Sequence, residues 1–194
     1  MGSSRGIRSA LTVAVILLVT LAMASPAHAD PGSGTVTVQA TNNAAITLSL
    51  NDSSADFGTN IDPLGTQSNS SDVNQVVSLR SESGSYYVWR SSGGNGLTVT
   101  VKSNTSWTGS VSASRNSGTS ASMTIDSGVL RYSSSPPASY YDAALSRPFT
   151  VSGSNFEAAG TKGVHTYTFF YALRVNWDDD PGTFVSSVTY SATH

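Results

Sequence analysis

The chain has 194 residues, with 12 acidic, 10 basic and no cysteine side chains, and only 11% of its residues are charged. The lack of cysteine excludes disulfides, thiolate metal sites and a thiol nucleophile. Setting aside Arg5 and Arg8 in the N-terminal segment leaves 8 basic against 12 acidic groups, a net charge of −4. This balance argues against binding nucleic acid or anionic lipid through phosphate neutralisation.

The first 29 residues have the pattern of a secretory signal peptide. Arg5 and Arg8 precede an apolar run over residues 10–24, and the small-x-small sequence AHA ends at Ala29. We expect cleavage after Ala29, because the run is shorter than the roughly 20 apolar residues of a membrane-spanning helix. An uncleaved membrane anchor is the alternative. The protein is therefore expected to be secreted, extracellular or at the cell surface, with no membrane insertion after cleavage.

Residues 30–34 (DPGSG) are expected to be a flexible leader, and residues 35–194 a single domain whose dominant sequence period is two. Apolar and polar residues alternate in TVTVQAT (35–41) and in AITLSL (45–50). Further strands, separated by Gly, Asn and Ser turns, are predicted at 73–80, 86–90, 97–102, 107–113, 121–125, 129–132 and 149–151.

The longest predicted strand covers 164–177, and its apolar side chains share one face. The segment 136–145 (PPASYYDAAL) departs from the pattern and allows a single helical turn after its prolines. Many short strands with polar turns predict an all-β fold, an antiparallel immunoglobulin-like β-sandwich, with a barrel as the alternative.

The sequence lacks the usual catalytic patterns, and we expect no enzymatic activity. It contains no Gly-x-Ser-x-Gly motif and no His-x-His or His-x-x-x-His spacing. His165 is expected to be an exposed histidine at a strand end, although pairing with a serine is an alternative. Glu82 and Glu157 are the only glutamates, and both are expected to be solvated charges in loops rather than a glycosidase pair.

Three consecutive aspartates, 178–180, provide the oxygen ligands that calcium prefers. Adjacent strand residues point to opposite faces, so Asp178 and Asp180 share one face and are the candidate metal ligands. Asp179 could join them only if the backbone turns. The following Pro-Gly favours a turn, and the main interpretation is a solvated acidic bend. A second, weaker calcium candidate consists of Asn51, Asp52 and Asp56. No other cofactor is expected.

The acidic bend is predicted to close a hairpin between the strand 164–177 and a final strand. In that final strand the residues that share one face are Phe184, Val188, Tyr190 and Ala192.

Aromatic side chains could stack on sugar rings if they were exposed. Tyr140 and Tyr141 lie in the one irregular segment and are the candidate glycan contacts. Trp89 and Trp177 belong to alternating apolar faces, so we expect both in the core.

The layout resembles that of secreted bacterial fibre and coat subunits. The quoted segments are the strand TVTVQAT, the Phe-Gly step in ADFGTNIDPLGT, and the ending YALRVNW, DPGTF, VSSVTYSATH. They resemble the spore coat protein U and chaperone-usher pilin group over residues 35–66 and 167–193, and more loosely the WxL-type cell-surface domains of Gram-positive bacteria. The chain departs from the first group in lacking a cysteine pair, and from the second because Trp177-Asp178-Asp179 lacks the leucine.

The pilin resemblance implies assembly by strand donation, in which Val36, Val38 and Ala40 fill a groove in a neighbouring copy. The alternative, which we favour from the sequence, is that residues 35–41 pair within their own sheet. The function expected is that of a non-catalytic structural or adhesive cell-surface protein, with its own copies as partners if it forms fibres. A carbohydrate or cell-wall binding module is the alternative.

Overall fold

The computed structural model describes residues 39–59, 61–65, 74–115 and 117–194, and the compact unit of the chain runs from Ala44 to His194. Its elements, in chain order, are β1 (Ile46–Leu50), β2 (Asn74–Ser81), β3 (Gly84–Ser92), β4 (Leu97–Ser103), β5 (Trp107–Ala113), β6 (Leu130–Ser133), α1 (Tyr140–Leu145), β7 (Arg147–Pro148), β8 (Ser154–Gly160), β9 (Gly163–Asn176) and β10 (Val188–Thr193). The signal-peptide and leader predictions lie outside the described residues.

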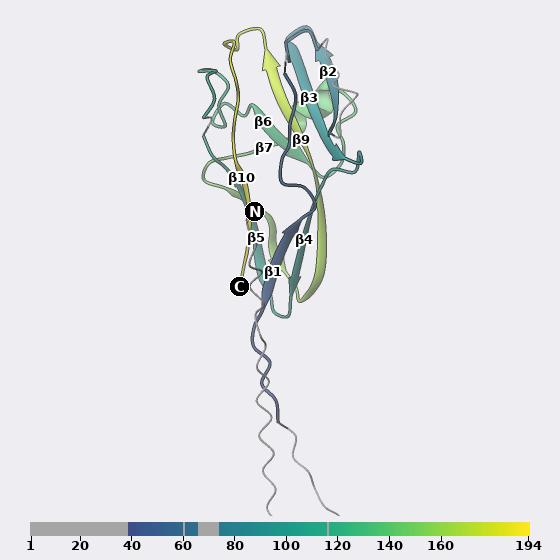
Figure 1. Ribbon diagram of the computed structural model, residues 1–194, viewed down its shortest axis with the longest axis vertical. Coiled ribbons are helices and arrows are strands. Elements are labelled where there is room, and N and C mark those ends of the chain that lie inside the picture. Colours follow the sequence, from purple (N-terminus) through teal and green to yellow (C-terminus); the bar gives the residue numbers. More distant parts are fainter. Residues whose placement is uncertain (1–38, 60, 66–73, 116) are drawn as a thin grey trace, which may run out of the picture. The chain divides into compact units, whose positions relative to one another are not determined.

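The strands form two antiparallel sheets (Figure 1). The larger sheet has the order β1-β4-β9-β3-β2, with β6 pairing β9 and β7, and the smaller sheet has the order β10-β5-β8. The sheets do not close into a barrel, which confirms the predicted all-β sandwich and makes the barrel alternative wrong. The immunoglobulin-like topology stays a prediction.

Strand β9 organises the larger sheet because it pairs along its whole length. Its first half pairs with β4, with Leu97 opposite Phe169, and its second half pairs with β3, with Trp89 opposite Tyr171. Strands β3 and β4 therefore follow each other along one side of β9, and β6 occupies part of the other side. The long strand predicted at 164–177 is confirmed, with one residue fewer at its C-terminal end.

The core lies between the two sheets and follows the period-two pattern of the sequence. Burial alternates residue by residue in β4 and β5, as strands with one face on a core require. Trp89, expected in the core, is 1% exposed and packs beside Tyr171 with ring centroids 5.5 Å apart. Burying a large apolar side chain in such a core stabilises the fold by roughly 1.5–3 kcal/mol.

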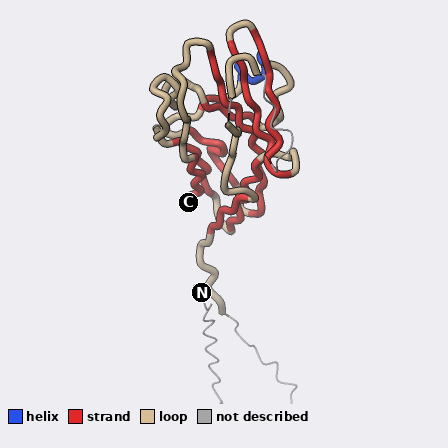
Figure 2. The backbone as a smooth tube through the Cα atoms, turned by 45° about the horizontal axis from the view of Figure 1, so that its top comes forward, coloured by secondary structure: helices blue, strands red, loops and turns tan. Residues whose placement is uncertain are grey.

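Helix α1 covers the outer face of the larger sheet, opposite the core (Figure 2). Its N-cap is Ser139, whose hydroxyl accepts a hydrogen bond from the Asp142 backbone N–H at 3.1 Å. Ala143 is fully buried against Tyr86 and Val88 of β3. The helical turn predicted within 136–145 is therefore confirmed, and it seals a second, smaller apolar cluster.

Several predicted elements are wrong. Segment 121–125 forms turns rather than a strand, although Met123 and Ile125 are buried. Segment 149–151 is outside the strands, and β8 was not predicted at all. The predicted hairpin is also wrong, because β9 belongs to the larger sheet and β10 to the smaller one. The segment 177–187 therefore crosses from one sheet to the other.

Within the described part of the chain, no helix is long and apolar enough to cross a membrane.

Candidate functional site: a groove between the sheet edges

A groove of about 460 Å³ opens between residues 51–57, which follow β1, and residues 184–188, which lead into β10. Strand β1 is an edge of the larger sheet and β10 is an edge of the smaller sheet. The groove therefore lies where both sheets end on the same side of the sandwich. We call it the edge groove.

The first wall forms because the chain leaves the sheet directly after β1. Asn51 closes the pairing with β4, since its side-chain oxygen accepts from the Thr98 backbone N–H at 2.7 Å. The Asp52 carboxylate then accepts from the backbone N–H groups of Ser53 and Ser54, at 2.8 and 3.3 Å. Aspartate commonly turns the backbone in this way, and the turn directs residues 53–57 away from β4.

The second wall is held by the loop that follows β5. The Ser187 carbonyl accepts from the Ser114 N–H at 2.8 Å, and the Ser187 N–H donates to the Ser114 hydroxyl at 2.8 Å. The Val185 carbonyl accepts from the Ser117 N–H at 2.9 Å. This wall thus extends the edge of the smaller sheet. Phe184, on the same wall, packs against the core.

The floor of the groove is aromatic and aliphatic, and it consists of Trp89, Leu97, Leu130, Tyr171 and Tyr190. The hydroxyl oxygens of Tyr171 and Tyr190 lie 3.0 Å apart and share a hydrogen bond. Burial raises the pKa of both phenols well above 10, so both stay neutral at physiological pH. An uncharged, apolar floor favours apolar side chains in any segment that enters the groove.

The predicted donor residues lie only partly within the described chain. Val36 and Val38 lie outside it, while Ala40 is exposed. Residues 39–45 form no strand. Residues 35–41 were expected to pair within their own sheet. Their described part, residues 39–41, belongs to neither sheet.

The acidic bend uses its aspartates for backbone contacts. The Asp179 carboxylate accepts from the Asn176 N–H at 2.7 Å, and the Asp180 N–H donates to the Ser122 hydroxyl at 2.6 Å. The described residues include no group of three or more His, Cys, Asp or Glu placed to hold a metal ion, at Asp178 and Asp180 or at Asp52 and Asp56. The calcium hypothesis stays a prediction.

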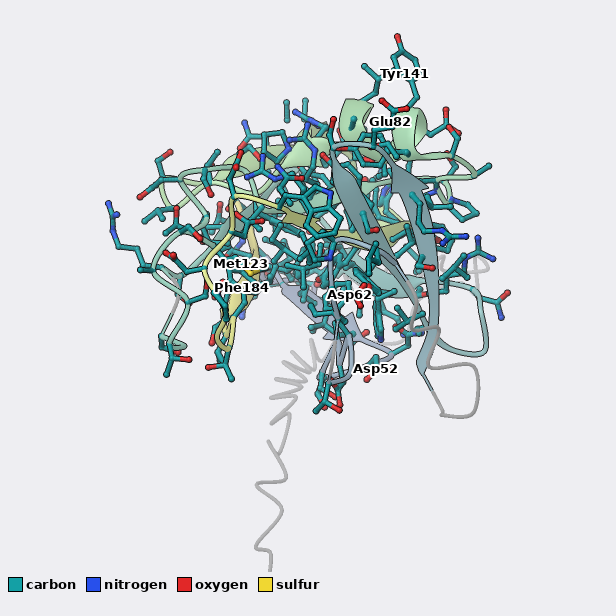
Figure 3. The ribbon with its side chains drawn as sticks, turned by 90° about the horizontal axis from the view of Figure 1, so that it is seen from above. Asp52, Asp62, Glu82, Met123, Tyr141 and Phe184 are labelled. Atoms are coloured by element: carbon teal, nitrogen blue, oxygen red, sulfur yellow. The ribbon has the colours of Figure 1, made fainter. Side chains whose placement is uncertain are left out.

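The two candidate glycan contacts have different surroundings. Tyr140 is partly buried, and its ring packs edge-on against Tyr86 with centroids 4.9 Å apart. Tyr141 is 69% exposed and projects away from the fold (Figure 3). They do not form one flat platform. Trp177, expected in the core, is 58% exposed because β9 ends one residue before it, so that prediction is wrong.

A polar and aromatic cluster at the β8–β9 corner was missed. Glu157, expected in a solvated loop, lies on β8 and accepts from the Tyr167 hydroxyl at 2.7 Å. Burial, followed by this hydrogen bond and the carboxylate charge, raises the pKa of Tyr167 to about 12. His165 is half-buried beside Trp107, with ring centroids 5.7 Å apart, so its predicted exposure is wrong. Glu82 is exposed in the β2–β3 turn, as expected.

A scan against protein-family models matches none, and searches of curated proteins and of solved structures find no match either.

Proposed function

We propose that the protein is a secreted, non-catalytic structural subunit of a cell surface, whose copies join when residues 35–41 of one copy enter the edge groove of the next. The observation that carries the proposal is the edge groove itself, which places an apolar floor between two sheet edges, those of β1 and β10, that no further strand of the described residues pairs. Unpaired edges offer free backbone N–H and C=O groups, and an added strand satisfies them.

The occupant is a second copy's segment 35–41 because its chemistry fits. Val36, Val38 and Ala40 alternate with Thr35, Thr37 and Gln39. In an extended strand, one face would therefore be apolar and could contact the neutral floor, while the other would be polar and could face water. The described part of this segment, 39–41, is exposed and belongs to neither sheet, which leaves it free to pair elsewhere.

The secreted location is part of the proposal and rests on the signal-peptide pattern of residues 1–29.

Size-exclusion chromatography with light scattering on residues 30–194 tests the assembly. We expect oligomers that grow with protein concentration, and monomers after deletion of residues 30–41. A sharper comparison replaces Val36 and Val38 with serine, which should abolish assembly, against the same replacement of Thr35 and Thr37, which should leave it intact. Monomers in every case, or equal effects of the two pairs, would contradict strand donation.

A carbohydrate or cell-wall binding module is the second candidate, and the exposure of Tyr141 favours it. Retention of the protein on purified cell wall, lost in Tyr141→Ala but kept in Tyr141→Phe, would support this function. Absence of retention would reject it.

A further inference from the structure

A second pocket, of about 630 Å³, lies between the turn Ile125–Gly128 and the segment 148–152, which begins at the last residue of β7. It shares no lining residue with the edge groove. Arg115 and Arg131 contribute positive charges to its lining, and Asp126 contributes a negative one. We call it the turn pocket.

Arg131 forms no ion pair within the described residues. Its Nη2 donates to the Ser146 carbonyl, but its buried Nε has no hydrogen-bond partner within the described residues. Arg174, on the same outer sheet face, also has a buried Nε without a partner there. The ion pair that the described residues do form joins Arg115 to Asp126. The charges of Arg131 and Arg174 both act on Tyr86, so they reinforce each other in this region.

Gly128 keeps the space beside the Arg131 guanidinium open. Its φ of +68° is a conformation that glycine adopts without strain. A Cβ placed at this position would lie 3.4 Å from Arg131 Nη1. A side chain here would therefore occupy the approach to the guanidinium.

Thr150 adds a second buried polar group without a partner. Its hydroxyl is buried, forms no hydrogen bond within the described chain, and belongs to the lining of the same pocket. Most buried side-chain polar atoms in folded proteins do have a partner. Both residues line one pocket, where a ligand that accepts hydrogen bonds could satisfy them.

The chemistry of these groups selects the ligand. A guanidinium has N–H donors and no acceptor, and a hydroxyl donates readily. Asp126, the acidic residue in the pocket lining, is paired with Arg115. We propose that the turn pocket binds an oxyanion group, a carboxylate or a phosphate, with Arg131 as its charged donor and Thr150 as its neutral donor. Charge-assisted bonds from arginine suit both kinds of group.

NMR detection of the Arg131 Nε–H resonance tests the proposal on the folded protein, residues 30–194. Separate titrations with inorganic phosphate and with glucuronate distinguish a phosphate from a sugar carboxylate as the source of the oxyanion. We expect saturable shifts of this resonance with at least one of them.

Four variants separate specific binding from general charge. Arg131→Gln should weaken binding about tenfold, and Thr150→Val about fivefold. Asp126→Asn removes the negative charge from the pocket lining and frees Arg115, so it should tighten anion binding about threefold. Lys102→Gln removes one exposed positive charge outside the pocket and should change affinity less than about twofold, because salt screens distant surface charges.

Circular dichroism and urea denaturation check that each variant is folded. If Arg131→Gln does not fold, the opposite effects expected of Thr150→Val and Asp126→Asn still decide the question. The absence of saturable shifts with either anion would overturn the proposal. So would a weakening by Lys102→Gln equal to that caused by the pocket variants.

Discussion

Tyr171 and Tyr190 connect the two sheets beneath the edge groove, with their hydroxyl oxygens 3.0 Å apart. Tyr171 belongs to β9 of the larger sheet and Tyr190 to β10 of the smaller one. Because β9 and β10 do not pair through their backbones, this side-chain bond helps to set how the two groove walls meet. It also ties the last strand of the chain to the central strand of the fold.

Replacing Tyr190 with phenylalanine should lower the free energy of unfolding by about 1–2 kcal/mol. The reason is that Tyr171, which is 6% exposed, would keep a buried hydroxyl without a partner. The double variant Tyr171→Phe/Tyr190→Phe should cost less than the sum of the two single variants. Urea denaturation measures all three. Tyr141→Phe, at an exposed site, is the control and should change stability by less than about 0.5 kcal/mol; strictly additive single variants would argue against the bond.

Stability should fall as the pH rises from about 10 to 12, in part because of Tyr167. Its pKa is about 12 in the folded protein and 10.0 for an ordinary tyrosine. Between these values the folded protein holds a proton that the unfolded chain has lost, so rising pH favours unfolding. The other buried tyrosines with raised pKa values act in the same direction.

The variant Glu157→Gln isolates the contribution of Tyr167. It removes the carboxylate charge but keeps a hydrogen-bond acceptor, so the pKa of Tyr167 should move down toward 10. NMR titration of the isotope-labelled tyrosine rings measures this pKa directly. An unchanged pKa in the variant would show that the carboxylate does not control it.

Gly160→Ala should destabilise the fold by about 1–3 kcal/mol through overpacking. A Cβ at Gly160 would lie 2.2 Å from Trp107 Cε2. The indole has little freedom to retreat, because its Nε1 donates to the Thr161 carbonyl at 2.9 Å. Gly93→Ala, at an exposed position where the nearest atom is a side-chain nitrogen at 3.3 Å, is the matched control. Thermal and urea denaturation compare the two, and equal midpoints would show that β8 shifts to make room.

Asp179→Ala should cost about 1 kcal/mol, whereas Asp178→Ala should cost less than about 0.5 kcal/mol. Asp179 accepts the Asn176 N–H as β9 ends, while Asp178 is exposed. Melting temperatures measured with and without calcium extend the comparison. We expect no calcium effect on the wild-type protein; a rise that Asp178→Asn removes would instead establish a metal site.

The strands that the sequence predicts well are those with one face on the core. In β4 and β5 the buried positions recur every second residue, and this pattern is visible without a structure. In β9 residues 169–173 are all buried, and Ala172 there packs against α1 on the outer face. Strand β8 (SNFEAAG) was missed because it carries one large apolar residue, Phe156. Gly160, at the end of this strand, is required by the close approach of Trp107.

Other errors arise where the alternation of apolar residues does not coincide with a strand. Met123 and Ile125 are buried in a segment whose turns are fixed by hydrogen bonds between Thr124 and Ser127. Alternation therefore predicted burial correctly but strand geometry wrongly. Trp177 continues the alternation of β9 for one residue after the strand has ended.

The candidate sites were less predictable than the strands. The edge groove depends on two segments far apart in the sequence, 51–57 and 184–188, and on which sheet each one joins. The sequence offered the donor residues, but not the position of the groove. The turn pocket left no recognisable motif, because its Arg131 and Thr150 are isolated single residues.

Disulfide cross-linking between two copies tests the central claim most directly, because the natural chain has no cysteine. One preparation carries Val38→Cys and the other Ala55→Cys in the groove wall, and they are mixed under mild oxidation. We expect a disulfide-linked dimer that contains one copy of each variant, in much higher yield than with Lys102→Cys as the second partner. Equal yields with Ala55→Cys and Lys102→Cys would contradict strand donation into the edge groove.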